Sequence, residues 1–217
     1  MIPAGIASSA YVKPKPLDTS IARWGFAEGS GTTSADLSGN NNTLTATGSP
    51  WNTTGRTGGG MKPSVSGYFT CSLGTGPLTK WTIMLWYRCD GIPVDQYSQF
   101  FFDISDMSGA DNNLWTDLNN TLNWGFWAGG AHYSTEPLVV GNWYHLTWSY
   151  DGATVTCYQN SVVTSSTAAS VSLQKSDTFC LGHGYDGSPN GIIDDVRIFD
   201  TPLTVEEITR YANLHVA

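Results

Sequence analysis

The chain has 217 residues, of which 40% are hydrophobic and 12% aromatic, and a formal net charge of −8. This acidic balance argues against nucleic acids and anionic membranes as partners, because their phosphates attract lysine and arginine. No apolar run is long enough to span a bilayer, so we expect no membrane insertion.

The first segment, residues 1–19, is predicted to be an extended N-terminal arm. Its K-P-K-P run at residues 13–16 is unsuited to a central strand, because proline lacks the backbone N–H. The arm either docks on a neighbour or lies on the surface of its own domain. The first ten residues lack the charged region and continuous apolar stretch of a secretory signal. We therefore expect an extracellular or virion-surface protein that either lost its signal or leaves its cell by lysis inside a particle.

The remainder, residues 20–217, is predicted to form one all-β domain. The alternation at residues 21–26 directs Ala22, Trp24 and Phe26 to the core. Residues 27–60 are rich in Gly, Ser, Thr and Asn, which predicts an irregular excursion with short strands. Residues 81–87 are apolar on both faces, as in a central strand. Further strands are predicted at residues 100–102, 122–127, 144–150 and 155–158.

The closing segment predicts a strand followed by a short helix. Residues 192–199 alternate, and this predicts one face with Asp194, Val196 and Ile198 and another with Ile193, Asp195, Arg197 and Phe199.

The helix is predicted to begin after Thr204. That residue is placed to be the N-cap of a capping box with Glu207, and Leu203 and Ile208 are spaced as a hydrophobic staple.

Several motifs resemble one family. Residues 193–208 read I-D-D-V-R-I-F-D-x-x-L-x-x-x-E-I, which is similar to the end of concanavalin A-like, laminin-G-like jelly-roll domains. W-G-F-A-E-G-S-G at 24–31 with D-L-S-G-N at 36–40 resembles the family's opening, and residues 141–160 resemble its W-x-H and Y-x-N-G strands. The pattern departs at Ser161, where the family usually has glycine. Over residues 20–214 the resemblance implies a two-sheet antiparallel jelly-roll sandwich with a short C-terminal helix.

A structural calcium ion is the one cofactor that the sequence points to. Calcium takes several oxygen ligands, and residues 28–42 offer Glu28, Asp36 and many carbonyl groups. The resemblance implies that Asp194 holds a structural calcium together with carbonyls of the first loops. Two metal-free alternatives stay open: Asp194 bonds the loop directly, or Asp195 and Arg197 form an ordinary ion pair.

Catalysis is not expected, and no catalytic residue is predicted. Glycoside hydrolysis needs two carboxylates flanking the bond. Enzymes of this fold carry them on one strand in an E-x-D-x-x-E pattern, which this chain lacks. His145 is expected to be a core histidine, and no G-x-S-x-G elbow is present.

Glycan binding is favoured by a concentration of aromatic and amide side chains. Sugar sites combine flat rings with a few polar groups. The candidate ligand-binding residues are Trp115, Trp124, Trp127 and Tyr133, with Tyr185, Asp186 and Asn190 from a later loop. The alternative for each ring is a place in the core of the sandwich.

The four cysteines, at positions 71, 89, 157 and 180, show no C-x-x-C spacing, which argues against zinc. We favour buried free thiols, with two disulfides as the alternative.

The function predicted from these features is a non-catalytic recognition or adhesion module, displayed on a surface as a virion decoration or host-surface glycan-binding protein. Its expected partners are a glycan or another host-surface ligand, structural assembly partners such as a viral shell protein, and further copies of itself in a homo-oligomer. The alternatives are a secreted carbohydrate-binding module of a polysaccharide-degrading system, and a glycan hydrolase or lyase with unrecognised catalytic residues.

Overall fold

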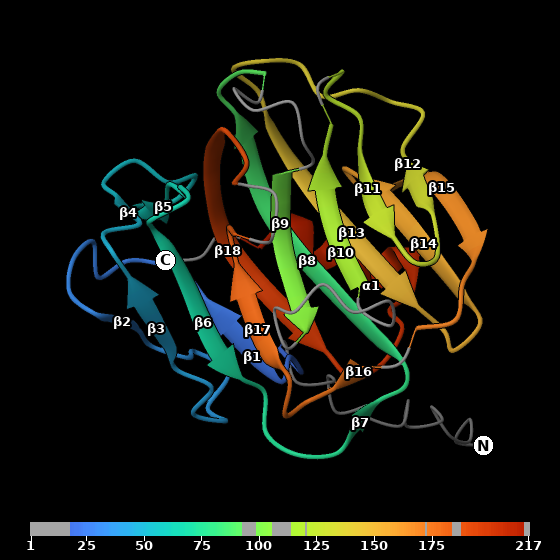
Figure 1. The fold of residues 1–217 in the computed structure, drawn as a ribbon, viewed down its shortest axis with the longest axis horizontal. Helices are drawn as coiled ribbons and strands as arrows, with labels where there is room; N and C mark the ends of the chain where they lie inside the picture. The colour runs from blue at the N-terminus through green and yellow to red at the C-terminus, as the bar shows by residue number, and fades with distance from the viewer. Residues whose placement is uncertain are drawn as a thin grey trace, which may run out of the picture.

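A computed structural model of the chain describes residues 18–92, 99–105, 114–119, 121–171, 173–183 and 188–214. These residues form two antiparallel sheets of eight strands each, a two-stranded ribbon and one C-terminal helix (Figure 1). The predicted all-β sandwich with a short C-terminal helix is therefore confirmed. The predicted arm lies outside the described residues up to position 17.

Sheet A has the order β15-β14-β13-β8-β18-β5-β4, and β1 also pairs with β18. Its strands are β1 (Ala22–Trp24), β4 (Trp51–Asn52), β5 (Gly60–Met61), β8 (Trp81–Cys89), β13 (Trp143–Tyr150), β14 (Thr154–Gln159), β15 (Val162–Ala168) and β18 (Gly191–Phe199). Strand β8 pairs with β13 on one side and β18 on the other, as expected for a strand that is apolar on both faces.

Sheet B has the order β12-β11-β10-β9-β17-β6-β3-β2. Its strands are β2 (Thr33–Ser34), β3 (Leu44–Thr47), β6 (Tyr68–Ser72), β9 (Gln99–Ser105), β10 (Leu114–Leu118), β11 (Trp124–Trp127), β12 (Ala131–Tyr133) and β17 (Thr178–Leu181). Strands β7 (Pro77–Leu78) and β16 (Leu173–Gln174) form the ribbon. Strands β2 to β5 are the short strands predicted within the irregular excursion.

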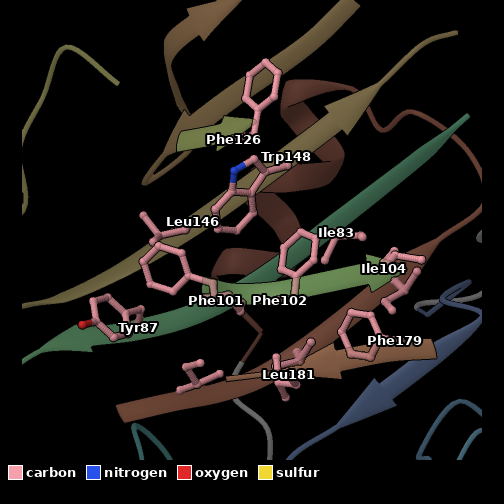
Figure 2. Close-up of a cluster of buried hydrophobic side chains, with 14 of the residues drawn as sticks. Ile83, Tyr87, Phe101, Phe102, Ile104, Phe126, Leu146, Trp148, Phe179 and Leu181 are labelled. Atoms are coloured by element: carbon pink, nitrogen blue, oxygen red, sulfur yellow. The ribbon is translucent and has the colours of Figure 1, made fainter. Parts of the chain in front are cut away.

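Aromatic side chains fill the space between the two sheets. The Trp148 ring packs edge-on against Phe102 at 5.1 Å and Trp124 at 5.0 Å between ring centroids, and Figure 2 shows Trp148 among its phenylalanine neighbours. Edge-to-face pairs of this kind are favourable beyond their buried area. The predicted core positions Ala22, Trp24 and Phe26 all belong to this cluster.

The four cysteines are free, as expected, and three of them are buried. Burial raises the pKa of Cys71, Cys157 and Cys180 to about 12. Their thiols therefore stay protonated at neutral pH and act as small apolar groups.

Strand β18 departs from the predicted alternation. Its pairing with β8 shifts between Asp194 and Arg197, and Asp195 has φ 43°. This is a β-bulge, which adds one residue and reverses the alternation beyond it. The core face carries Ile193, Val196 and Ile198, whereas Asp194, Arg197 and Phe199 lie on the outer face of sheet A. The prediction that Asp194 shares a face with Val196 and Ile198 is wrong for this reason.

Helix α1 (Val205–Ala212) covers part of that outer face. Thr204 is the N-cap and forms a capping box with Glu207, as predicted. Leu203 and Ile208 are buried in a cluster with Met84, Phe199 and Tyr211. The staple thus fixes the helix on sheet A.

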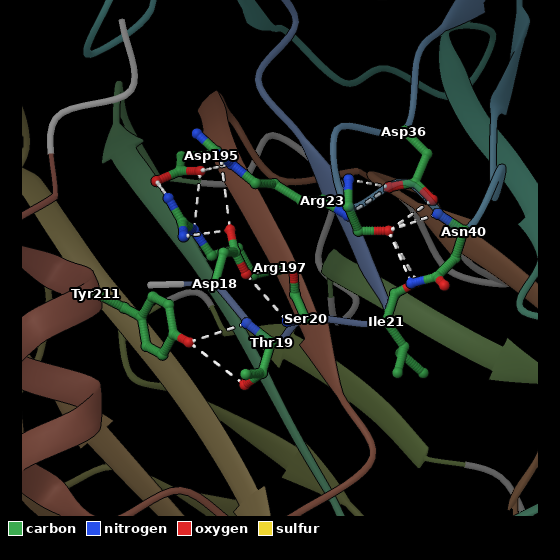
Figure 3. A network of polar contacts seen from close by, with 11 residues as sticks. Asp18, Thr19, Ser20, Ile21, Arg23, Asp36, Asn40, Asp195, Arg197 and Tyr211 are labelled. Atoms are coloured by element: carbon green, nitrogen blue, oxygen red, sulfur yellow. Dashed lines mark hydrogen bonds and ion pairs between the residues drawn. The ribbon is translucent and has the colours of Figure 1, made fainter. Parts of the chain in front are cut away.

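A network of buried charges lies under the helix. The Arg197 guanidinium donates to both carboxylate oxygens of Asp195 at 3.1 Å and to Asp18 at 2.9 Å. Arg23 lies within ion-pair distance of both acids, and Figure 3 shows the four side chains together. Each buried charge has an opposite charge beside it, which offsets its desolvation.

The hairpin between β14 and β15 turns through two residues. Asn160 and Ser161 have φ 53° and 69°, the left-handed values that a type I′ turn requires. Ser161 therefore takes a conformation that glycine adopts without strain.

Candidate functional site

The outer face of β10, β11 and β12, here called the β10–β12 face, carries an exposed tryptophan. Trp127 is 41% exposed at the end of β11. Its register partners are Trp115 on β10 and Ala131 on β12. The opposite face of β11 carries Phe126, which is buried in the core. Large apolar side chains are common inside a sandwich, so an indole directed away from the core marks this face as a candidate ligand surface.

A glycine and a tyrosine continue this face beside Trp127. Tyr133 is the register partner of Gly125, and strand alternation places both on the side of Trp127. A Cβ on Gly125 would lie 2.1 Å from the His132 carbonyl oxygen, so only glycine allows β12 to approach β11 this closely. Trp127 and Tyr133 are therefore diagonal neighbours, with no side chain between them at Gly125.

The predicted ligand residues divide between several places. Trp127 and Tyr133 share the β10–β12 face, and the backbone of β10 places Trp115 opposite Trp127. Tyr185 and Asp186 lie outside the described residues.

Two of the predicted ligand residues lie elsewhere. Trp124 is fully buried, and its indole N–H donates to Gln159 Oε1 at 2.7 Å, so its assignment to a binding surface is corrected to the core. The Asn190 carbonyl accepts from the Tyr87 hydroxyl and the Asp90 N–H, which places it at the end of β8 in sheet A. A strand pattern can show which rings alternate, but not which sheet face the second sheet covers.

Asp194, the first of the predicted calcium ligands, accepts three backbone N–H groups. Its Oδ2 takes those of Arg56 at 2.8 Å and Thr57 at 3.1 Å, and its Oδ1 takes that of Asp195 at 2.7 Å. Burial raises the pKa of Asp194 to about 6 against the effect of these bonds. This arrangement matches the metal-free alternative in which Asp194 bonds the loop directly.

The other two predicted ligands are occupied in the same way. Asp36 accepts from the N–H groups of Arg23, Ser38 and Asn42 at 2.8–3.0 Å, and Glu28 accepts from Ala35 N–H at 2.7 Å. Within the described ranges, no group of three or more His, Cys, Asp or Glu side chains is arranged to hold a metal. N–H groups thus bond all three carboxylates, and the calcium ion expected at these residues stays a prediction.

His145 lies in β13 and is buried, as expected, but on the outer face of sheet A and not in the core between the sheets, where its neighbours Tyr144 and Leu146 lie. Burial lowers the pKa of His145 to about 3, with a smaller effect from the nearby charges of Arg197 and Arg56. The imidazole is therefore neutral in the folded protein. Of the helices in the described part, none has both the length and the apolar character needed to cross a bilayer.

The chain is similar in sequence to one known family and in structure to several solved proteins. A family model described as the concanavalin A-like lectin/glucanases superfamily matches residues 63–209. No curated protein matches the chain in sequence.

Solved structures share the fold at low sequence identity. Domain 4 of AbnA, a GH43 extracellular arabinanase from Geobacillus stearothermophilus in complex with arabinotriose, is 20% identical with a TM-score of 0.66, covering 89% of this chain and 98% of that one. The binding domain of Paraclostridial Mosquitocidal Protein 1 is 15% identical, with a TM-score of 0.70 over 91% of this chain and 52% of that one. Trypanosoma rangeli sialidase in complex with the inhibitor DANA is 11% identical, with a TM-score of 0.67 over 88% of this chain and 32% of that one. At these identities the likeness shows the fold alone.

Proposed function

Because this chain belongs to the concanavalin A-like lectin/glucanases superfamily, we propose that it is a non-catalytic recognition module that binds carbohydrate through its β10–β12 face. The observation that carries the proposal is the outward indole of Trp127, which is 41% exposed and has Tyr133 as its diagonal neighbour on β12. A fold of this kind hosts several functions, so membership of the family does not by itself assign one to this chain.

The geometry of the β10–β12 face suits a sugar ring. A pyranose or furanose ring presents C–H groups on its flat faces, and an exposed indole offers an apolar surface of matching size. The β12 backbone packs directly over Gly125, which brings Tyr133 close to the exposed Trp127 ring. The ligand would lie flat on the sheet, with its hydroxyl groups directed to solvent and to polar side chains at the rim.

The non-catalytic part of the proposal is supported by the engagement of the buried carboxylates of sheet A. Asp194 accepts three N–H groups, and Asp195 is bound at both oxygens by Arg197. A general acid or nucleophile must instead reach the glycosidic bond. Loss of a polysaccharide-cleaving activity on changing a single Asp or Glu would overturn this part.

The setting that we propose is extracellular or virion-surface display, with a glycan or host-surface ligand and with assembly partners such as a shell protein or further copies of the chain. The second candidate setting is a secreted module of a polysaccharide-degrading system. It is favoured by the near-complete coverage, 98%, of a domain that belongs to an arabinanase.

A glycan array, followed by titration calorimetry with the best ligand, tests the proposal. Trp127→Ala should weaken binding about five- to thirtyfold, because stacking on one aromatic ring is worth on the order of 1–2 kcal/mol. Trp143→Ala is the matched control: this indole lies on sheet A, and its loss should leave affinity unchanged. Equal affinity of Trp127→Ala and the native protein would reject the β10–β12 face, and binding of plant polysaccharides alone would favour the secreted module.

A further inference from the structure

A second surface feature lies on the opposite side of the molecule, between the outer face of sheet A and α1. It is a cavity of about 230 Å³. Five segments of the chain meet there: the β4–β5 loop with Arg56, β8 with Trp86, β13 with His145, the β14–β15 turn with Asn160, and α1 with Thr209. We call this cavity the α1 pocket.

Arg56 is held in this pocket at both its backbone and its side chain. Its N–H donates to Asp194, and its guanidinium lies 3.6 Å from the centroid of the Trp86 ring. Stacking occupies one flat face of the guanidinium and leaves the N–H groups on its edge available. In the part of the chain that the structure describes, no carboxylate lies within ion-pair distance of Arg56.

The other arginines of the network contrast with Arg56. Arg23, Arg88 and Arg197 each pair with an aspartate, whereas Arg56 and Arg210 pair with none among the described residues. The chain has 18 acidic and only 10 basic side chains, so carboxylates are in excess. An arginine without an acidic neighbour in such a protein is available for an external anion.

Two further N–H donors lie near Arg56, on Trp86 and on Asn160. The Trp86 indole N–H is buried and has no acceptor among the described residues. The Asn160 Oδ1 already accepts the backbone N–H of His145 at 2.9 Å, which leaves the side-chain NH2 of Asn160 to donate. His145 is neutral, with its pKa lowered to about 3, and packs edge-on to Trp86 at 5.2 Å.

Acidic side chains are absent from the lining of the α1 pocket over the described residues. Asp194 on β18 is the register partner of Trp86, but its carboxylate is fully buried and bound by three N–H groups. The Arg56 guanidinium, the Asn160 amide and the Trp86 ring therefore line the same small space.

We propose that the α1 pocket binds the carboxylate group of an acidic sugar unit. The Arg56 guanidinium would donate two parallel hydrogen bonds to the carboxylate, and the sugar ring would lie toward Thr209 and Asn160. The volume is below the roughly 300–1,000 Å³ of sites for drug-sized ligands, so the pocket suits a single sugar unit. The sugar part of this inference rests on the proposed glycan binding, whereas the carboxylate part rests on the α1 pocket alone.

The test is a calorimetric titration with two probes that differ only at one group, methyl glucuronide and methyl glucoside. The native chain should bind the glucuronide about tenfold or more tightly than the glucoside, because a charge-assisted pair with arginine is lost in the neutral sugar. Arg56→Gln should abolish this preference. The backbone N–H that Asp194 accepts remains in that variant, and an unchanged thermal melt checks that the fold is retained.

Arg210→Gln is the matched control, since Arg210 stacks on Tyr211 and does not line the α1 pocket. It should keep the full preference for glucuronide. Trp127→Ala separates the two proposals: it should weaken binding of the neutral glycan found on the array and leave the glucuronide preference intact. Equal binding of the two probes by the native chain, or a preference that survives Arg56→Gln, would overturn the α1 pocket as a carboxylate site and leave the β10–β12 face untouched.

Discussion

The two sheets use their outer faces in opposite ways. Sheet B leaves an apolar ring, Trp127, open to solvent, whereas sheet A buries charged groups, Asp195 and Arg197, beneath a helix. Burial therefore does not follow from residue type in either place. Whether a side chain is buried depends on whether a second layer of structure covers its face of the sheet. Substitutions on the two sheets should therefore differ in their effect on stability.

The largest effect is expected within β11 itself, where two tryptophans lie three residues apart. Trp124→Ala removes a fully buried indole that packs on Trp148, and should lower the free energy of unfolding by about 3–5 kcal/mol. Trp127→Ala removes a side chain that is 41% exposed, and should cost much less stability. Chemical denaturation of both variants measures the contrast. Similar losses in the two would show that Trp127 belongs to the core.

Asp194→Ala tests the outer face of sheet A. The change leaves three backbone N–H groups without their acceptor. A fully buried group of this kind costs on the order of 1–3 kcal/mol, and two of these three are only part-buried, so a loss near the lower end, about 3 kcal/mol, is expected. Asp151→Ala is the control, because Asp151 also accepts two N–H groups but at an exposed turn, and a smaller loss is expected there.

The native protein and Asp194→Ala also test the calcium prediction. Since N–H groups occupy the Asp194 oxygens, adding a chelator should leave the melting temperature of the native chain unchanged. A chelator-dependent fall that disappears in Asp194→Ala would establish a metal at this residue.

Acid should act on His145 and Asp194, two of the buried titratable groups of this face, with opposite sign. The folded pKa of His145 is lowered from 6.5 to about 3, so its contribution to stability is present above pH 6.5 and is lost as the pH falls toward 3. The folded pKa of Asp194 is raised from 3.8 to about 6, so its contribution is present below pH 3.8 and is lost as the pH rises through 6. Each group changes stability by at most about 1.4 kcal/mol per pH unit, and between pH 4 and 6 the two largely cancel.

His145→Gln should expose this compensation. Without the histidine, stability should rise as the pH falls from 6 to 4, relative to the native protein measured under the same conditions. Parallel pH profiles of the two proteins would show that His145 is not buried as a neutral group.

The smallest effect is expected at the β14–β15 turn. Ser161→Gly removes the backbone strain of a non-glycine residue at φ 69°. It should stabilise the protein by about 1 kcal/mol, although glycine also adds conformational freedom to the unfolded chain. A small upward shift of the denaturation midpoint is the measurement. Asn160 is the natural comparison, because asparagine tolerates this conformation better than serine, so Asn160→Gly should gain less.

The residue pattern alone determined the class of the fold, the central place of β8, the core positions of the first strand and the start of α1. These are local properties: strand alternation, an apolar run and a capping box act over a few neighbouring residues. The pattern also drew attention to the segment that carries Trp127 and Tyr133, and to Asp194.

Tertiary structure decided the rest. One inserted residue at Asp195 reversed the alternation of β18, and packing of the second sheet placed Trp124 inside while Trp127 stayed outside. The role of Asp194 depends on a loop 138 residues away in the chain, and the α1 pocket forms only where five separate segments meet. Such contacts have no local signature, because they arise from the pairing of strands that are distant in sequence.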